Sequence, residues 1–362
     1  MVQDIIRNQK RLLLPLAAAI PLLLTALFHL LKGNKALMGG WVFGVVAPLE
    51  QTLGRFWGIF SFSGAEALTA AALTGTGVWL LWAVVPLWRK QVGHSLRRVF
   101  ALAATGLWLW AGLCWFWNAA YYAPTFAQQS GLKVEPYPVE RLSQVTAYYA
   151  QHAARLSAEV PRDQEGHFLR DTEAWFEAAD GVYDGIAEQF PLLEANTGRP
   201  KGLVCSRLQS LLGFTGVYFP FTGEANVNVD APACLIPATI AHEMAHQRMV
   251  ASEQEANFVG IVAAITSGHT TYAYSGYLFG LIQLCNALYP VAPEVWSAIA
   301  TTYFTPEMAQ DWRDNNEYWA ALSSPMEDAA EQAYDSFLKT NGQELGIRSY
   351  GACVDLLVAW TE

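Results

Sequence analysis

The stretch Ala-His-Glu-Met-Ala-His-Gln-Arg-Met-Val-Ala-Ser-Glu-Gln-Glu-Ala-Asn-Phe, residues 241–258, is the one around which we expect the fold to form. His242, Glu243 and His246 make the pattern HExxH. Two helical residues four positions apart share one face, so both imidazoles can reach one metal ion. Zinc is the ion typical of this pattern, and Glu243 can then reach a water on it. The stretch therefore predicts a zinc site on a helix; the alternative is an ordinary amphipathic helix with two surface histidines.

The third ligand is predicted from helix geometry. If the helix continued without a break, Glu253 would lie about 10 Å beyond His246, too far to share an ion. Ser252 followed by Glu255 matches a capping box, which predicts that the chain turns and that a new helix starts at Glu253. We therefore expect Glu253 as the third ligand and keep Glu255, which the cap would occupy, in reserve.

Charge and hydropathy divide the chain near residue 120. The chain has 362 residues, 53% of them hydrophobic, and a net charge of −10, and this length suits two or three domains. Residues 1–120 carry ten Lys and Arg against three Asp and Glu, whereas residues 121–362 carry twelve against twenty-nine. The acidic part argues against nucleic acid as a partner, and the basic, apolar part is typical of an anchor in the lipid bilayer.

Three apolar stretches in the first part are long enough to cross about 30 Å of hydrocarbon. They are residues 12–31, 67–88 and 99–117. Tryptophans near the ends of the last two are typical of membrane interfaces. We expect three transmembrane helices, and a cleaved signal peptide is the alternative for the first.

Basic residues predict the orientation of these helices. The short loop between the second and third stretches holds Arg89, Lys90, Arg97 and Arg98. By the positive-inside rule this loop is cytoplasmic. The N-terminus is then cytoplasmic as well, and residues 121–362 lie outside the cytoplasmic membrane. The basic residues that oppose this orientation are Lys32 and Lys35.

Residues 38–64 are apolar, but glycines, Glu50 and Arg55 interrupt them. Such a segment is too broken to be a span and suits helices that lie on a membrane surface. We expect interfacial helices here, and either membrane-edge packing or substrate contact is compatible with the sequence.

Two short extended runs lie on either side of Thr222-Gly223 within residues 217–229. This pattern predicts a hairpin or a pair of edge strands. An edge strand before the ligand helix could hold an extended peptide by backbone hydrogen bonds, with Glu224 and Asn226 lining it as substrate-binding residues. An interpretation of both as plain turn and strand residues is equally good.

The stretch after the expected ligands offers two supporting residues. Asn257, one turn after Glu253, could orient a ligand by a hydrogen bond. Tyr274 is our choice for a catalytic donor to the oxyanion of a tetrahedral intermediate; a core aromatic with a satisfied hydroxyl is the alternative. Residues 258–289 are very apolar, but Ser267-Gly268-His269-Thr270 interrupts them, so we expect buried core helices rather than a fourth span.

Four of the five cysteines fall in the expected outer domain: Cys205, Cys234, Cys285 and Cys353. They could form two disulfides or remain as buried free thiols. Their wide spacing contains no CxxC, which argues against a second zinc site.

The motif resembles that of the gluzincins, zinc metallopeptidases whose third ligand begins an ExxxD on the next helix. Glu253-Gln-Glu-Ala-Asn257 matches this pattern with Asn in place of Asp, and Met249 and Val250 stand in the turn where we expect a glycine. The whole chain is similar to a family of uncharacterised bacterial membrane proteins with a zincin-like core, a domain of unknown function. The likeness lies in Phe-Ser-Gly-Ala-Glu (62–66), Pro-Phe-Thr-Gly-Glu-Ala (220–225), His-Glu-Met-Ala-His-Gln (242–247), Glu-Ala-Asn-Phe (255–258), Tyr-Ser-Gly-Tyr-Leu (274–278) and Ser-Tyr-Gly (349–351).

The expected fold is mostly α (α+β). Three N-terminal transmembrane helices in residues 1–120 precede a zincin-like, helix-rich domain in residues 121–362 with a small β-hairpin or sheet. Motif and resemblance together predict a membrane-anchored zinc (Zn²⁺) metallohydrolase, most simply a peptidase acting on a peptide or protein, with Glu243 as general base. The alternative is a non-catalytic membrane sensor or assembly protein with a structural or vestigial zinc site. An intramembrane protease is disfavoured, because Arg248, Glu253 and Glu255 do not suit a lipid-exposed helix.

Overall fold

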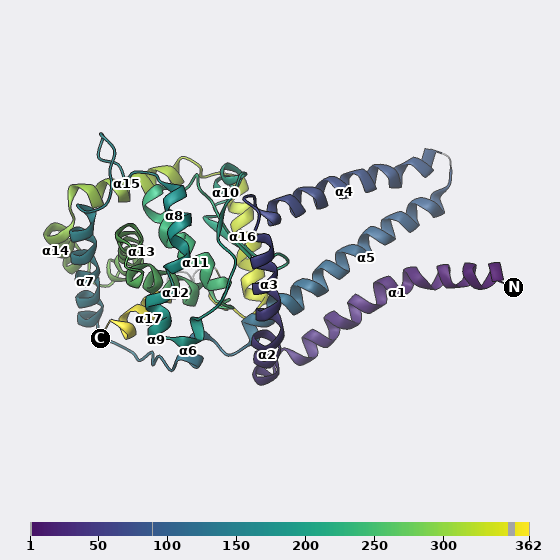
Figure 1. Cartoon of the computed structure of the whole chain (residues 1–362), viewed down its shortest axis with the longest axis horizontal. Helices are drawn as coiled ribbons and strands as arrows, with labels where there is room; N and C mark the ends of the chain where they lie inside the picture. The colour runs from purple at the N-terminus through teal and green to yellow at the C-terminus, as the bar shows by residue number, and fades with distance from the viewer. Residues whose placement is uncertain (1, 89, 347–351, 362) are drawn as a thin grey trace. The chain divides into compact units, whose positions relative to one another are not determined.

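The computed structural model of the protein describes residues 2–88, 90–346 and 352–361, with the side chains from residue 15 onward. The chain is mostly helical and has one three-stranded sheet, as the sequence predicts (Figure 1). It forms two compact units, Met1–Val46 with Gly64–Ala123 and Ala47–Ser63 with Pro124–Glu362. The expected boundary near residue 120 lies close to the second join, but residues 47–63 belong with the second unit. The Ser-Tyr-Gly stretch at 349–351 lies outside the described residues.

The first unit consists of helices. They are α1 (Val2–Leu31), α2 (Lys35–Trp41), the π-helix η1 (Val42–Val46), α4 (Gly64–Trp88), α5 (Val92–Phe116) and the 3₁₀-helix η2 (Asn118–Tyr122). Helix α5 packs against both α1 and α4, and the buried Phe28 meets the Trp115 ring edge to face with centroids 5.8 Å apart.

Two helices of the described chain are long and apolar enough to cross a membrane, Gly64–Trp88 and Val92–Tyr122. They cover the second and third predicted spans and indicate membrane association. Three clear spans are not shown: of the first predicted span, residues 12–31, the side chains are described only from Pro15, and the described apolar stretch Pro15–Leu31 is shorter than the other two.

The second unit holds the remaining elements. Its first half contains α3 (Ala47–Trp57), α6 (Phe126–Ser130), α7 (Val139–Ser157), α8 (Thr172–Ala178), η3 (Ala179–Gly181), α9 (Asp184–Gln189), η4 (Pro191–Leu193), β1 (Lys201–Gly202), α10 (Ser206–Leu211), β2 (Gly216–Phe219) and β3 (Glu224–Val227). Its second half contains η5 (Ala233–Leu235), α11 (Ile236–His246), α12 (Glu253–Thr266), α13 (Thr270–Leu288), α14 (Pro293–Tyr303), α15 (Pro306–Ala320), α16 (Pro325–Thr340) and α17 (Cys353–Trp360).

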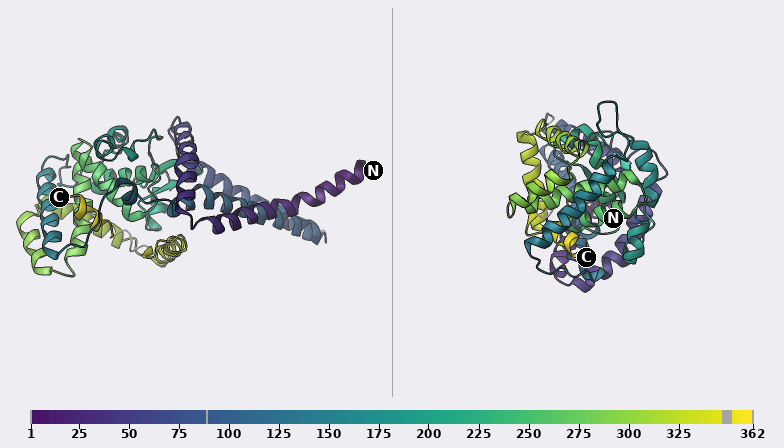
Figure 2. Two further views of the ribbon diagram at one scale, coloured as in Figure 1. Left: turned by 90° about the horizontal axis from the view of Figure 1, so that it is seen from below. Right: turned by 90° about the vertical axis from the view of Figure 1, so that its left-hand side faces the viewer.

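The core of this unit is formed by α12 and α13. Helix α12 packs against α11 and α13, and α13 packs against α7. The C-terminal helix α17, yellow in Figures 1 and 2, packs on α12 and α13. The apolar run at 258–289 is therefore a pair of buried core helices, as predicted. All five cysteines are free, and Cys205 is the exposed one.

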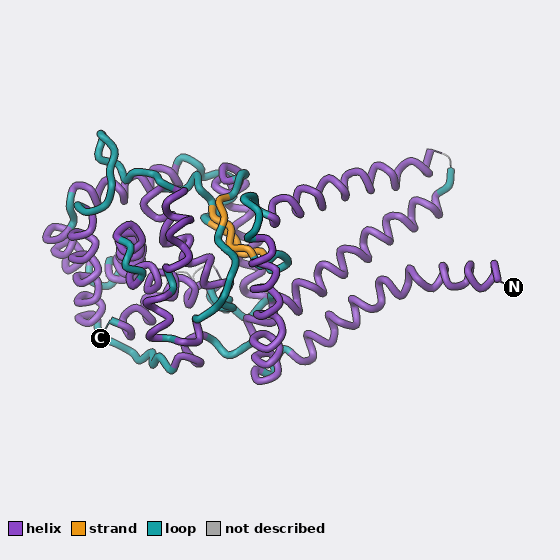
Figure 3. Tube along the Cα trace, in the orientation of Figure 1, coloured by secondary structure: helices purple, strands orange, loops and turns teal. Residues whose placement is uncertain are grey.

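The strands of the sheet, orange in Figure 3, have the order β1-β3-β2. Strands β2 and β3 are antiparallel, with Gly216 opposite Val227 and Phe219 opposite Glu224, and β1 runs parallel to β3. Gly223 in the connecting turn has φ of 65°, a conformation that glycine adopts without strain. The hairpin prediction is confirmed. However, β3 is the central strand and β2 is an outer one.

Helix α3 is part of the second unit because it packs on this hairpin. A Cβ on Gly54 would lie 2.6 Å from the carbonyl oxygen of Gly223. The Tyr218 hydroxyl of β2 donates a short hydrogen bond to the buried Glu50 carboxylate of α3. The second half of the segment 38–64, for which we expected interfacial helices, therefore packs on the sheet of the second unit, and its location at a membrane surface stays a prediction.

Candidate metal centre

The chain reverses between His246 and Glu253, as the sequence predicts. Helix α11 ends at His246, and α12 begins at Glu253 with Ser252 as its N-cap residue. Met249 lies between them with φ of 62°. This is the left-handed conformation for which we expected a glycine. The reversal brings the first turn of α12 back onto the last turn of α11.

Three side chains converge after this reversal: His242, His246 and Glu253. The Oε2 atom of Glu253 lies 3.3 Å from Nε2 of His242 and 3.7 Å from Nε2 of His246. One potential ligand atom from each residue lies within 4.8 Å of the other two, and all three side chains are buried. Two imidazoles and a carboxylate at this separation could hold one metal ion.

Hydrogen bonds outside the cluster orient its members. His246 Nδ1 lies 2.7 Å from the carbonyl oxygen of Val250. Because that oxygen can only accept, Nδ1 carries the proton and Nε2 is left to face Glu253. The other carboxylate oxygen of Glu253, Oε1, accepts a 2.5 Å hydrogen bond from the Tyr334 hydroxyl of α16.

The close approach of α11 and α12 depends on Gly260. A Cβ at this position would lie 2.8 Å from the backbone nitrogen and Cα of His242. Real Cβ atoms do not come this close to backbone, so glycine is required where the two helices meet. The residue thereby fixes the distance between His242 on α11 and Glu253 on α12.

Glu243 follows His242 on α11 and lies against strand β2. A Cβ on Gly216 would be 2.7 Å from Cγ of Glu243, so the absence of a side chain there leaves room for the carboxyl group. Glu243 is buried, and its Oε2 atom has no hydrogen-bond partner among the described residues. A buried polar atom without a partner is rare and suggests a role other than folding.

The electrostatics of the cluster follow from burial and from the mutual contacts. Burial raises the pKa of Glu243 to about 7, against the lowering effect of the two histidines. Burial opposes ionisation of Glu253 too, but His246 and His242 outweigh it and hold the Glu253 pKa well below its ordinary value. Burial also disfavours the charged form of His246, yet Glu253 raises the His246 pKa above its ordinary value. A proton and a metal ion would therefore compete for His246.

The structure corrects the predicted capping box and shows what occupies Glu255, the reserve ligand. The Ser252 side chain forms no capping hydrogen bond. Glu255 instead accepts hydrogen bonds from the backbone nitrogens of Phe126 (2.8 Å) and Ala127 (2.9 Å), at the start of α6. These bonds anchor the start of α6 to α12. Glu255 is therefore engaged away from the three-residue cluster. Asn257 is buried one turn after Glu253 on α12, and its role as an orienting residue stays a prediction.

Glu224 and Asn226, expected to line a substrate edge, are engaged elsewhere. Glu224 forms a buried ion pair with Lys201, with 2.7 Å between Oε1 and Nζ. Asn226 accepts a 2.7 Å hydrogen bond from the Ser63 hydroxyl. Both lie on the central strand, where Asn226 is paired with β1 as well as β2 and Glu224 is paired with β2. Their side chains therefore hold residues 57–63 to the sheet.

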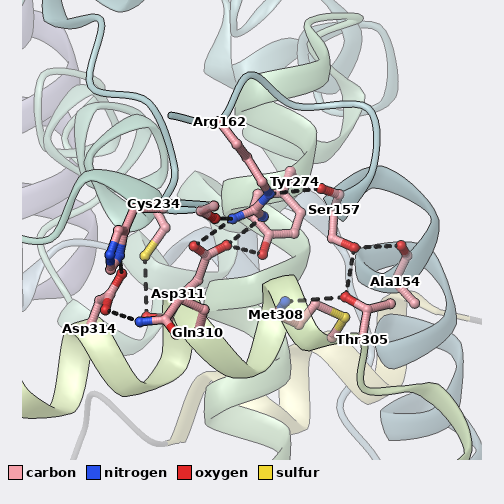
Figure 4. Close-up of polar contacts among 12 residues, drawn as sticks. Ala154, Ser157, Arg162, Cys234, Tyr274, Thr305, Met308, Gln310, Asp311 and Asp314 are labelled. Carbon is pink, nitrogen blue, oxygen red and sulfur yellow. Dashed lines mark hydrogen bonds and ion pairs between the residues drawn. The ribbon is translucent and has the colours of Figure 1, made fainter. Parts of the chain in front are cut away.

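Tyr274, expected as the oxyanion donor, belongs to a different cluster. Its hydroxyl donates a short hydrogen bond to Asp311, which also binds Arg162 through both carboxylate oxygens (Figure 4). The tyrosine ring stacks on Phe168. With this bond made, the Tyr274 hydroxyl is a satisfied core group, which was the alternative interpretation.

Several residues of the site had no recognisable signal in the sequence. Tyr334 lies 81 positions after Glu253 in an ordinary acidic helix. Gly216 and Gly260 are single glycines whose close contacts appear only when the elements pack. Tyr218 lies near the His246 ring, with centroids 6.4 Å apart, and depends on the distant Glu50.

The fold and the cluster together define a helix-rich, membrane-associated protein with a buried two-histidine, one-glutamate centre that could hold a metal ion. The chain belongs to a protein family of unknown function, DUF3810, which matches residues 43–358 and thus parts of both units. No curated protein and no solved structure matches the chain.

Proposed function

We propose that the protein is a membrane-associated, zinc-dependent hydrolase, most simply a peptidase of the gluzincin type. The observation that carries the proposal is the convergence of His242 and His246 of α11 with Glu253 of α12. Glu243 lies on α11 directly after His242. This donor set is typical of catalytic zinc sites, which keep a fourth position for water or substrate. Zinc bound there would polarise a carbonyl group and acidify a water molecule.

The roles of the chain's own residues follow from their positions. Glu243 accepts the proton of the attacking water and delivers it to the leaving amine. Its Oε2 atom has no hydrogen-bond partner among the described residues and is therefore available to a water molecule. The Val250 carbonyl and the Tyr334 hydroxyl keep His246 and Glu253 oriented.

Strand β2 is the element best placed to hold an extended peptide. It is an outer strand of the sheet, and its Gly216 lies directly beside Glu243. A peptide that paired with β2 would add a strand to the sheet by backbone hydrogen bonds. The substrate edge would then be β2 rather than the side chains of Glu224 and Asn226.

The distribution of basic residues supports a location of the site outside the cytoplasmic membrane. Arg89, Lys90, Arg97 and Arg98 lie between α4 and α5 or at the start of α5, a pattern that favours the cytoplasmic side. An outward-facing site would meet peptides or proteins at the cell surface. Cysteine accessibility of the α4–α5 loop in intact cells would test this orientation.

The first experiment is metal analysis of the full chain, purified in detergent without chelator. We expect one zinc per chain in the wild type and in Glu243→Gln, and a loss of zinc in His246→Ala and Glu253→Ala. The matched control is Glu255→Ala, which removes a carboxylate two positions away without touching the cluster. A peptide library incubated with wild type and Glu243→Gln then tests catalysis, with a loss of about 10²–10⁴-fold expected from the removal of a general base.

Two results would contradict the proposal in different ways. Absence of zinc in the wild type, before and after addition of zinc, would overturn the metal site itself. Stoichiometric zinc that requires a fourth protein ligand, without hydrolysis, would instead favour the non-catalytic sensor or assembly protein.

A further inference from the structure

Residues 56–62, Phe-Trp-Gly-Ile-Phe-Ser-Phe, form an uncharged ridge on the second unit. The largest exposed fractions are 76% for Ile59 and 53% for Phe56, and Phe60 and Phe62 are exposed as well. The rings of Phe56, Trp57, Phe60 and Phe62 contact one another, with centroids 5.4–5.9 Å apart. This aromatic ridge is a continuous apolar surface rather than a set of scattered side chains, and such surfaces mark interaction sites.

A buried lysine holds the ridge in place. Lys201 Nζ donates to the carbonyl oxygens of Trp57 (2.6 Å) and Phe62 (2.7 Å) and to Glu224 Oε1 (2.7 Å). These three bonds use all three donors of the ammonium group. The Ser63 hydroxyl adds a bond to Asn226. The buried Lys201 ammonium group therefore holds both ends of this exposed apolar loop, so the ridge has a defined conformation.

The neighbouring chain indicates what covers the ridge. Gly64 follows Ser63 in the chain and begins α4, a helix long and apolar enough to cross a membrane. Residues 56–62 therefore lie within a few residues of the point where the chain would enter the hydrocarbon. Aromatic residues without charge are typical of the lipid–water interface at such points.

We propose that the aromatic ridge docks the second unit onto the lipid–water interface and so keeps the candidate site close to the membrane. The sheet connects the ridge to the site. Lys201 of β1 and Asn226 of β3 bind the loop that carries the ridge. Asn226 pairs with Val217 on β2, and Gly216 of β2 lies beside Glu243. Strand β2 spans only about 10 Å at 3.3 Å per residue. On the proposed function, the substrate class is then a polypeptide attached to the membrane and cut near its surface.

Site-directed spin labelling of the full chain in vesicles tests the docking directly. In a Cys205→Ser background, which removes the exposed cysteine, nitroxide labels are placed at Ile59→Cys and at the control Val291→Cys. Val291 is 58% exposed and lies between α13 and α14. In vesicles of phosphatidylethanolamine and phosphatidylglycerol, we expect the Ile59 label to be several-fold more accessible to oxygen than to a water-soluble nickel chelate, and the Val291 label to show the reverse. Equal nickel accessibility at both positions would overturn the docking.

The substrate class is tested by presenting one fluorogenic peptide mixture either free or attached to a lipid anchor in the same vesicles. We expect faster hydrolysis of the anchored form, and loss of that advantage in Ile59→Ser/Phe60→Ser with zinc content unchanged. Equal rates for both forms would overturn the membrane-attached substrate while leaving hydrolysis intact. If neither form is hydrolysed, the proposed function is overturned. The spin-label measurement would still decide whether the ridge docks on the membrane.

Discussion

The second unit contains two buried charged clusters that differ in how completely their polar atoms are paired. In one, Asp311 accepts hydrogen bonds from Arg162 at 3.0 and 2.8 Å and another from Tyr274. In the other, Glu243 Oε2 and His242 Nδ1 have no hydrogen-bond partner among the described residues, and Glu253 Oε2 contacts the imidazoles of His242 and His246 at 3.3 and 3.7 Å. The comparison separates a cluster that serves folding from one that needs an additional ligand to be satisfied.

The two clusters also differ in what they connect. Asp311 on α15 joins the loop that carries Arg162 to α13, so it fastens segments that are distant in sequence. The His242 cluster joins two consecutive helices that already share extensive packing through Gly260. Loss of the first should therefore affect stability most, and loss of the second should affect function most.

The largest expected effect distinguishes the clusters by stability. Asp311→Asn leaves the partly buried Arg162 without its counter-charge, and we expect it to lower the free energy of unfolding by about 3 kcal/mol. Glu243→Gln removes a buried carboxyl group that has an unpaired oxygen, and we expect no loss of stability in the metal-free protein. Thermal unfolding followed by circular dichroism in detergent measures both. Comparable destabilisation by the two substitutions would remove the distinction.

Glu50 offers an intermediate case, with one oxygen bonded to Tyr218 and the other without a partner among the described residues. Burial raises the Glu50 pKa to about 8, although the hydrogen bond from Tyr218 acts in the opposite direction. Between pH 4.5 and 8 the unfolded chain loses this proton and the folded chain keeps it. Stability is therefore fully present below pH 4.5 and falls as the pH rises toward 8.

We expect Glu50→Gln to reduce that fall, with a gain of up to about 3 kcal/mol at pH 7 relative to the wild type. Unfolding midpoints measured from pH 4 to 8 test this expectation, and the exposed Glu194→Gln controls for the loss of one negative charge. An unchanged pH dependence in Glu50→Gln would show that Glu50 is already ionised in the folded protein, and that its burial does not raise its pKa.

The sequence was sufficient for the parts of the site that depend on local geometry. The spacing of His242 and His246, the reversal before Glu253 and the hairpin around Gly223 each follow from a few consecutive residues, and the structure has them where the sequence predicts. We expected the Glu255 carboxylate to be engaged by a helix cap, and the structure engages it with a distant segment instead. Its partners are the backbone nitrogens of Phe126 and Ala127, which no local pattern indicates.

The remaining parts depend on contacts between distant segments. Glu224 and Asn226 look like edge residues until β1 is placed beside β3 and Lys201 and Ser63 reach them. Tyr274 looks like a candidate donor because it follows the ligands in sequence, yet helical packing directs its hydroxyl to Asp311. The assignment of residues 47–63 to the second unit rests on contacts such as Gly54 with Gly223. These contacts have no counterpart in hydrophobic periodicity.

A substitution that leaves every charge of the metal cluster in place tests whether helix spacing matters. Gly260→Ala would place a Cβ 2.8 Å from the backbone of His242, and we expect a loss of about 1–3 kcal/mol in stability from overpacking. Because the displacement separates α11 from α12, zinc affinity should fall as well. The control is Gly181→Ala, where the nearest atom would be 3.6 Å away. Normal zinc affinity in Gly260→Ala would show that the cluster tolerates a changed helix separation.

The smallest change concerns the hydrogen bond from Tyr334 to Glu253. Tyr334→Phe keeps the ring that packs on Phe214, so its cost in stability should be about 1 kcal/mol. Zinc affinity, measured by competition with a chromogenic chelator, should nevertheless fall about 10–100-fold, because residues that orient a ligand affect metal binding strongly. Tyr318→Phe is the matched control, since it removes a tyrosine bond to Asp230 outside the cluster. If both variants bind zinc like the wild type, Tyr334 is a packing residue of α16. The hydrogen bond to Glu253 would then contribute nothing to metal binding, and the contrast between the two clusters would be smaller.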